Sequence, residues 1–301
     1  MTASGVTRRI LITGANGQLA KELVAHPVSA DYEVTALARS SLDIGDRNAV
    51  HSAIDTLAPD LVINTAAYTA VDQAESEREL AFKVNGEGPA NLAEALAGSD
   101  SRLVHISTDF IFDGKKTEPY RIDDKASPIN VYGQSKLVGE QAVQRLLSRR
   151  TIIVRSSWIY SRHGKNFVKT MLSLMQEKDT LNVVADQFGS PTWASNLATA
   201  IWKLVICGQE SGIYHYSDNG TATWFEFAQA IHAEGMRLGL IPNNVEISPI
   251  STQQYRTAAQ RPKYSVLGDK VKPPLTDADF EDWKQALREM LIDLKEKGSQ
   301  N

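Results

Sequence analysis

Cysteine is nearly absent from this chain of 301 residues. The single cysteine, Cys207, excludes an internal disulfide and is typical of proteins from a reducing compartment. Because it follows the apolar stretch AIWKLVI, we expect Cys207 to be a small, buried apolar residue.

Long apolar runs are missing as well. No run approaches the ~20 residues that a membrane-spanning helix requires. The first residues, MTASGVTRRILIT, also lack the apolar centre and the small-residue cleavage site of a signal peptide. We therefore expect a soluble protein of the cytoplasm that does not bind membranes.

No segment concentrates charge of one sign. The net charge is −4, and the 32 Lys and Arg residues are interspersed among 36 Asp and Glu residues. Without a basic block, the chain is not expected to bind nucleic acid or an anionic membrane surface. The histidines show no metal-ligand spacing, so we expect no metal site.

Short apolar segments alternate with segments of helical periodicity through the first half of the chain. Strands are expected at 9–13, 32–38, 60–67, 102–108 and 151–157, and helices at 17–26, 48–58, 73–85, 88–98 and 132–147. These strands are rich in Val, Ile and Leu without polar alternation, which indicates burial on both faces. The order predicts an α/β fold with a Rossmann-type, doubly wound parallel sheet.

The last third of the chain is less regular. Strands are expected at 181–186 and 212–217, helices at 193–206, 223–237 and 277–296, and turns at 241–251 and 270–280. We expect a dinucleotide-binding type of domain at 1–160, with a return segment at 193–217. The remaining segments, 161–192 and 218–301, are expected to form a smaller and partly interleaved lobe.

A glycine-rich turn follows the first expected strand. In ILITGANGQLAKE, Gly14 and Gly17 lie between the strand and a helix, and Ala20 takes the third small position. Glycine lets the backbone approach a pyrophosphate, whose charge is favoured at a helix N-terminus. The pattern predicts a dinucleotide site, although glycine turns also join strands to helices where no ligand binds.

The end of the second strand bears on the kind of dinucleotide. A carboxylate there would hydrogen-bond the ribose 2′-hydroxyl of NAD. The sequence instead has Arg39, Ser40 and Ser41, with no carboxylate before Asp43. A guanidinium pairs well with a 2′-phosphate, so we favour NADPH and keep NADH as the alternative. Arg39 as a merely solvated residue is the competing interpretation.

Three polar side chains of chemical interest should meet at the carboxyl edge of the sheet. Thr108 ends the fourth strand, and Tyr132 and Lys136 lie one turn apart at the start of the next helix. Reducing a carbonyl group needs a hydride on carbon and a proton on oxygen. A nearby ammonium stabilises a phenolate and so lowers the pKa of a phenol from its usual ~10. Thr108 could hydrogen-bond the same carbonyl oxygen.

Several stretches together carry a resemblance to a known family. The glycine turn, the hydroxyl after the fourth strand and the Tyr-x-x-x-Lys pair resemble the extended short-chain dehydrogenase/reductase superfamily. Further stretches, from about residue 10 to 267, resemble the dTDP-4-dehydrorhamnose reductase family: LDIGD, INTAAYTAVDQAE, VNGEGPANLAEA, STDFIFDG, SPINVYGQSKLVGE, RSSWIY, GKNFVKTML, LNVVADQFGSPTWASNLA and RPKYSVL.

This resemblance implies an activity and roles for particular residues. The family reduces the C4 ketone of dTDP-4-dehydro-L-rhamnose, with a catalytic set that matches Thr108, Tyr132 and Lys136 here. It implies a pyrophosphate site at Gly14, Asn16, Gly17, Gln18 and Leu19. It implies further cofactor contacts from Asp43, Ile44, Ala66, Ala67, Tyr68, Tyr132 and Lys136, beside the Arg39 and Ser40 identified above.

The smaller lobe is implied to bind the substrate, a dTDP-linked 4-keto-6-deoxy sugar. Asp109 and Trp158 resemble residues that line the sugar pocket, and Arg261 is the candidate for the diphosphate. Trp158 as a core aromatic and Arg261 as an exposed turn residue are the alternatives. Asn85 is expected either to order a water molecule in the site or to cap the next helix.

The sequence departs from the family at two places that matter. Phe110 stands where tyrosine is common, which removes one hydroxyl near the pocket. Some family members hold magnesium between subunits through two carboxylates, and Glu22 matches the first. Ser195 and Asn196 occupy the region of the second. A hard cation on one carboxylate would bind weakly, so we expect no magnesium and either a monomer or a homodimer.

Two other functions compete with this one. The first is reduction of another nucleotide-linked 4-keto-6-deoxy sugar. The second is a non-catalytic, NADP-binding regulatory subunit that resembles the one found with some methionine adenosyltransferases. The intact set of Thr108, Tyr132 and Lys136 favours an enzyme.

Overall fold

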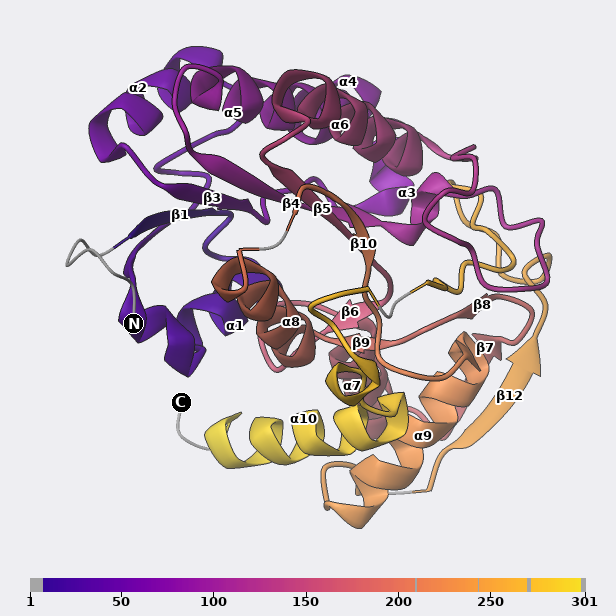
Figure 1. Ribbon diagram of the computed structural model, residues 1–301. Helices are drawn as coiled ribbons and strands as arrows, with labels where there is room; N and C mark the ends of the chain where they lie inside the picture. The colour runs from indigo at the N-terminus through magenta and orange to yellow at the C-terminus, as the bar shows by residue number, and fades with distance from the viewer. Residues whose placement is uncertain (1–7, 209, 243, 270–271, 299–301) are drawn as a thin grey trace.

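The computed structural model describes residues 8–208, 210–242, 244–269 and 272–298. Its centre is a sheet of six parallel strands (Figure 1). In spatial order these are β10 (Gly212–His215), β5 (Thr151–Ser156), β4 (Arg102–Thr108), β3 (Leu61–Asn64), β1 (Arg9–Thr13) and β2 (Glu33–Leu37). The expected parallel, Rossmann-type α/β sheet is confirmed. Strand order reverses between β1 and β3, and crevices at such a switch point bind ligands.

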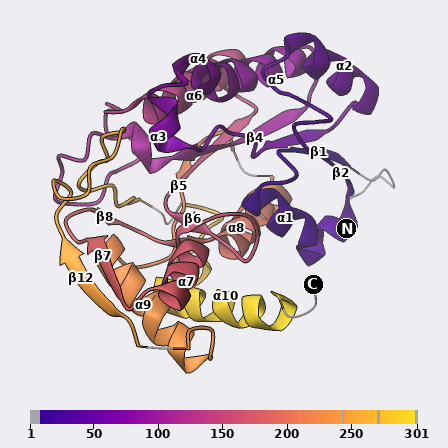
Figure 2. The same ribbon diagram turned by 180° about the vertical axis from the view of Figure 1, so that it is seen from behind.

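Helices cover both faces of the sheet, which explains why its central strands carry so few polar residues (Figures 1 and 2). One face is covered by α2 (Arg47–Leu57), α4 (Arg78–Phe82), α5 (Gly88–Leu96) and α6 (Val131–Leu147). The other is covered by α1 (Gln18–Ala25) and α8 (Ala194–Ile206). Short elements connect them: η1 (Pro27–Asp31), α3 (Val71–Ala74), the π-turn η2 (Lys83–Glu87) and η3 (Asp109–Ile111).

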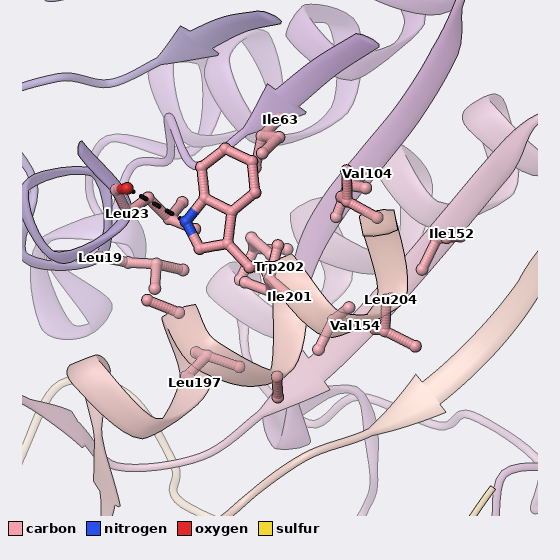
Figure 3. Packing of buried hydrophobic residues seen from close by; sticks show 14 of the residues in the cluster. Leu19, Leu23, Ile63, Val104, Ile152, Val154, Leu197, Ile201, Trp202 and Leu204 are labelled. Carbon is pink, nitrogen blue, oxygen red and sulfur yellow. Dashed lines mark hydrogen bonds between the residues drawn. The ribbon is translucent and has the colours of Figure 1, made fainter. Parts of the chain in front are cut away.

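Trp202 anchors α8 against α1 and the sheet. Its side chain is 1% exposed and packs with aliphatic side chains from both helices and from β3, β4 and β5 (Figure 3). The indole nitrogen donates a hydrogen bond to the Leu23 carbonyl at 3.1 Å, drawn as a dashed line in Figure 3. Burial of this large ring is favourable because its one polar atom keeps a partner.

A second hydrophobic cluster lies apart from the sheet. It is built from α7 (Phe167–Glu177), α9 (Trp224–Arg237) and α10 (Trp283–Gly298), which lie together below the sheet in Figure 1. Small strand pairs border it: β7 (Thr180–Val184) with β12 (Glu246–Ile250), β6 (Ile159–Tyr160) with β9 (Thr192–Trp193), and β8 (Phe188–Gly189) with β11 (Ala222–Thr223). The 3-10 turn η4 (Asp277–Asp279) precedes α10.

Two expectations outside the main sheet were wrong. The segment 241–251 was expected as a turn because of its Pro and Asn residues, yet Glu246–Ile250 forms β12. Among the residues that the structure describes, this strand pairs with β7 alone, and Pro249 is tolerated at such an edge because its missing N–H is not needed. Cys207 is exposed rather than buried, because it caps α8 after the last buried turn.

A buried ion pair joins α6 to β5. The Arg155 guanidinium donates to both carboxylate oxygens of Glu140, with Nε at 3.0 Å from Oε1 and Nη2 at 2.8 Å from Oε2. The two side chains are 5% and 1% exposed. Nη1 donates to the Ile122 carbonyl at 3.2 Å and lies 3.4 Å from Nε2 of His215 on β10. Burial lowers the pKa of His215 to about 4, so this ring is neutral beside the guanidinium.

None of the helices in the described ranges is long and apolar enough to cross a membrane.

We predict that Glu140→Ala lowers the free energy of unfolding by about 3–5 kcal/mol, because it leaves a buried guanidinium without its carboxylate. Urea denaturation followed by circular dichroism measures this loss. Arg47→Ala, which breaks an exposed pair with Glu94, is the matched control and should cost less than ~1 kcal/mol. Equal losses in both variants would contradict a special role for the buried pair.

Candidate active site

The glycine turn after β1 is built for close backbone contact. Gly14 has φ +75°, and a Cβ there would lie 2.8 Å from backbone atoms of Ala66. The Gly17 N–H closes the turn by donating to the Gly14 carbonyl at 2.8 Å. Gly17 is also the N-cap of α1 and supplies no side-chain acceptor. The first N–H groups of α1 are therefore suited to an anion, and the turn fits a pyrophosphate.

The other residues expected at the pyrophosphate differ in what they can offer. Asn16 is exposed on the turn, whereas the Leu19 side chain is buried in the core, which leaves its backbone for a ligand. The Gln18 side chain accepts a hydrogen bond from Asn166 Nδ2 at 2.8 Å. Because Asn166 caps α7, Gln18 links the glycine turn to the second cluster of helices.

The end of β2 presents its polar side chains to solvent. The Arg39 side chain is 67% exposed, and its Nε lies 3.5 Å from Oδ2 of Asp43. Ser40 is exposed, and Asp43 accepts the Gly45 N–H at 3.0 Å. Ile44, by contrast, packs in the core, and its carbonyl accepts Asn91 Nδ2 at 2.9 Å. Arg39 is thus available to an incoming anion, and the Ile44 side chain is not at the surface.

Strand register places a polar row beneath the switch point. Thr13 pairs with Asn64, and Asn64 pairs with His105, across three neighbouring strands. Thr13 Oγ1 donates to Asn64 Oδ1 at 2.7 Å, and Asn64 Nδ2 lies 3.1 Å from His105 Nδ1. Burial, and next to it the charge of Lys136, hold the pKa of His105 well below its usual value. His105 is therefore a neutral core imidazole.

Asn85 plays a part that the sequence did not reveal. It lies in η2, and its side chain hydrogen-bonds the backbone of Tyr68, accepting the N–H at 2.8 Å and donating to the carbonyl at 3.0 Å. Its amide also donates to Ser135 Oγ at 3.0 Å. Asn85 thus ties the segment after β3, which includes Ala66, Ala67 and Tyr68, to α6.

Two glycines bring α6 against the backbone of its neighbours. A Cβ on Gly133 would overlap the Phe110 carbonyl, and one on Gly139 would overlap the Asn85 carbonyl. Asn130 caps the helix by accepting the Gly133 N–H at 2.8 Å. The start of α6 is therefore held next to the end of β4.

This placement of α6 sets the side chains of Tyr132 and Lys136 beside β4. The Lys136 ammonium is buried and donates to the Ile106 carbonyl of β4 at 2.6 Å. Burial lowers the pKa of Lys136 to about 8, opposed by the charge of Glu140. Burial raises the pKa of Tyr132 to about 12; a hydrogen bond from Thr108 opposes the shift, and the charge of Asp109 adds to it. The expected lowering of the phenol pKa was wrong for this state, because desolvation outweighs the hydrogen bond from Thr108.

Thr108 and Asp109 form a buried pair beside the phenol. Thr108 Oγ1 donates to Asp109 Oδ1 at 3.1 Å and accepts the Phe110 N–H at 3.2 Å. Burial raises the pKa of Asp109 to about 7, while the hydroxyls of Ser265 and Thr108 oppose that shift. The Phe110 ring meets the Tyr132 ring edge to face, with centroids 5.6 Å apart. Ser265, from the stretch RPKYSVL, was not among the residues expected here.

The two remaining substrate candidates have partners within the protein. Trp158 has φ +46° and stacks on Trp224, with ring centroids 3.5 Å apart. Arg261 forms a bidentate pair with Asp72, with Nη1 at 3.0 Å from Oδ1 and Nη2 at 2.6 Å from Oδ2. The hydrogen bond from Arg261 is the main cause of the lowered pKa of Asp72. Arg261 is therefore no exposed turn residue, and Asp72 was missed.

Two other features of the described residues do not belong to this site. Glu22 lies 3.9 Å from His163 Nε2, and no group of three or more His, Cys, Asp or Glu residues there could hold a metal ion. A cavity of about 900 Å³ opens at the amino ends of the strands, lined among others by Arg9, Asp60 and Arg102. It lies away from the carboxyl edge, where ligands of open α/β sheets bind.

Comparison with known proteins agrees with this geometry. The profile of the family described as RmlD substrate binding domain matches residues 8–296. The dTDP-4-dehydrorhamnose reductase of Aggregatibacter actinomycetemcomitans is 41% identical over 93% of this chain and 97% of its own length. The dTDP-4-keto-6-deoxy-D-glucose reductase of Streptomyces niveus is 41% identical over 87% of this chain and 89% of its own.

Solved structures extend the agreement to three dimensions. The crystal structure of dTDP-4-dehydrorhamnose reductase from Bacillus anthracis in complex with NADP matches with a TM-score of 0.87 and 38% identity. The match covers 96% of this chain and all of that one, 100%. The family profile, the relatives and the fold agree over nearly the whole length. The chain therefore belongs to the dTDP-4-dehydrorhamnose reductase family.

Proposed function

We propose that this protein reduces the C4 ketone of dTDP-4-dehydro-L-rhamnose to dTDP-L-rhamnose with NADPH. The observation that carries the proposal is the convergence of Thr108, Tyr132 and Lys136 at the carboxyl edge of the sheet, the same edge that carries the glycine turn. It is supported by relatives named for this activity at about the same length.

Tyr132 is the proposed proton donor to the ketone oxygen. A pKa of about 12 keeps the phenol protonated at neutral pH, which is the form that a reduction needs. Lys136 lies one turn along the same helix, and its buried positive charge would stabilise the phenolate that forms. The Thr108 hydroxyl would hydrogen-bond the same ketone oxygen.

The glycine turn, the start of α1 and Arg39 are the proposed site for NADPH, which supplies the hydride when bound. The backbone N–H groups of Gln18 and Leu19 at the start of α1 would hold the pyrophosphate, and Arg39 the 2′-phosphate. The segment of Ala66, Ala67 and Tyr68, with Asp43 and the backbone of Ile44, would flank the nucleoside. The Bacillus anthracis relative, solved with NADP, supports this choice of cofactor.

The dTDP-sugar is proposed to bind between the sheet and the lobe of residues 161–192 and 218–301. Asp109 and Trp158 would contact the sugar. Arg261 would meet the diphosphate by exchanging its present carboxylate partner, Asp72, for the ligand. We further propose that the protein works in the cytoplasm, as a monomer or a homodimer.

One observation favours a second substrate of the same class. The Streptomyces niveus relative is named for reduction of dTDP-4-keto-6-deoxy-D-glucose and shares 41% identity with this chain. The two sugars differ in stereochemistry and both present a ketone at C4, so the same acid–base set would serve either.

The deciding assay follows NADPH oxidation with each of the two freshly prepared keto sugars, and repeats it with NADH. A kcat/KM higher for dTDP-4-dehydro-L-rhamnose, with dTDP-L-rhamnose as product, supports the first proposal. A preference for the glucose-derived sugar would replace it. No oxidation with either sugar, from protein that still binds NADPH, would refute both.

Tyr132→Phe should lower kcat by more than about a hundredfold, since it removes the proposed proton and leaves the ring in place. The Kd for NADPH and the urea midpoint should change little, because the phenyl ring keeps its edge-to-face contact with Phe110. Stopped-flow absorbance and fluorescence titration measure these quantities. Turnover near that of the wild type would remove Tyr132 from the mechanism.

Arg39→Asp should shift cofactor preference from NADPH toward NADH, lowering the ratio of their kcat/KM values at least tenfold. The new carboxylate would repel a 2′-phosphate and could accept the 2′-hydroxyl of NADH. Arg47→Asp changes an exposed arginine on α2 by the same charge and is the matched control. If both variants keep the wild-type ratio, Arg39 does not discriminate between the cofactors.

A further inference from the structure

Asp109 is a buried carboxyl that forms no ion pair with any cation in the described part of the chain. It follows β4 as the first residue of η3, its side chain is 2% exposed, and no described Lys or Arg forms an ion pair with it. The groups that face it are the hydroxyls of Thr108 and Ser265, the Phe110 N–H and, on α6, the phenol of Tyr132. Burial favours the neutral form of this carboxyl and raises its pKa to about 7, although the hydrogen bonds from Ser265, Thr108 and Phe110 oppose the shift.

Lys136 is not among the groups that shift the pKa of Asp109. The Lys136 ammonium is directed to the Ile106 carbonyl, and its charge is opposed by Glu140 one turn further along α6. A protonated Asp109 is therefore a buried acid whose hydrogen-bond partner is a hydroxyl, at 3.1 Å, and not a base.

The hydroxyl of Thr108 has a defined capacity for hydrogen bonds. Like any hydroxyl it offers one proton and two acceptor positions. The Phe110 N–H, at 3.2 Å, fills one acceptor position. When Asp109 is protonated, its O–H fills the other, and the bond seen between the two side chains reverses direction. The one Thr108 proton then remains for the Tyr132 oxygen, to which Thr108 also hydrogen-bonds.

We propose that Asp109 is the proton source behind Tyr132, and that Thr108 passes its proton to the phenol during reduction of the ketone. The inference rests on the proposed function and deepens it. It assigns the Thr108 hydroxyl to the tyrosine oxygen instead of the substrate carbonyl.

The transfer balances as follows. The ketone carbon receives the hydride with its electron pair, and the ketone oxygen takes the proton of Tyr132. The phenol oxygen takes the proton of Thr108, and Thr108 takes that of Asp109. Three O–H bonds break and three form. The alcohol is complete, both hydroxyl side chains are restored, and Asp109 is left as a carboxylate that solution protonates before the next cycle.

The chain of transfers makes a weak acid effective. A phenol with a pKa of about 12 releases its proton reluctantly, whereas an acid with a pKa of about 7 holds the resulting negative charge far better. Tyr132 alone touches the ketone, but the charge ends on Asp109.

The proposal fixes the sign of the pH dependence. Reduction needs protonated Asp109, so kcat/KM should be highest below its pKa and fall as the pH rises through about 7. Without the transfer, the fall should move to higher pH, where Lys136, with a pKa of about 8, and Tyr132 govern the rate.

The test is the pH profile of kcat/KM for four variants beside the wild type. Asp109→Asn should be at least about tenfold slower below pH 7 and should lose the fall near neutrality. Thr108→Val keeps the Asp109 carboxyl but removes the hydroxyl that passes its proton on, so kcat/KM should no longer fall near neutral pH. Thr108→Ser keeps a hydroxyl and should restore that fall. Asp113→Asn changes a carboxylate of the neighbouring loop, bonded to Tyr120, and should keep the wild-type fall.

Two results would overturn the transfer. If kcat/KM of Thr108→Val still falls near pH 7, Asp109 acts through its charge alone. A neutral fall that survives in Asp109→Asn would assign it to another group. If the wild type oxidises NADPH with neither keto sugar, the proposed function fails, and the transfer fails with it. If the wild type is active but the pH profiles of Asp109→Asn and Thr108→Val match its own, only the transfer is refuted.

A measurement on the free protein does not depend on turnover. Infrared difference spectra between acid and alkaline samples should contain the C=O stretch of one protonated carboxyl that titrates near neutral pH and is absent from Asp109→Asn. The same band should persist in Thr108→Val. A wild-type spectrum without it would show that Asp109 does not titrate near neutral pH and would overturn the proposal.

Discussion

The approach of α6 to the backbone beneath it is the constraint on which the candidate site depends. Gly133 and Gly139 leave no room for a side chain against the carbonyls of Phe110 and Asn85. Only this closeness lets the Lys136 ammonium reach a β4 carbonyl and sets Tyr132 beside Thr108. The tyrosine and lysine are the proposed proton donor and its cation, and the glycines between and after them determine where those two side chains lie.

Much of the fold could be predicted, because strands that are buried on both faces are recognisable in the sequence as runs of Val, Ile and Leu. The parallel sheet and its switch point follow from that pattern. β12 was not predicted because the Pro and Asn residues of this segment favour a turn, and its two isoleucines are too weak a signal for a strand. The structure accommodates Pro249 because β12 lies beside β7 at the edge of a two-stranded sheet. Cys207 was misplaced because the pattern of a helix does not say where its last buried turn ends.

The site was predictable in its residue types and not in their electrostatics. Spacing places Thr108, Tyr132 and Lys136 on neighbouring elements, but burial decides their protonation, and burial depends on segments far away in sequence. Ser265 and Asp72 have no local signal, since each acts through a contact with a distant segment. Asp109 was expected as a sugar contact, and its raised pKa emerged only when its burial was known.

The late position of β10 in the sequence has a consequence for folding during synthesis on the ribosome. β10 pairs with β5 at one side of the sheet, yet the entire segment from Ser157 to Ser211 is translated between them. Until β10 emerges, β5 is an unpaired edge, and such edges are prone to pairing with other chains. A nascent chain that ends before residue 212 therefore cannot complete its sheet. Premature arrest of translation in this interval would leave an aggregation-prone intermediate and not a finished domain.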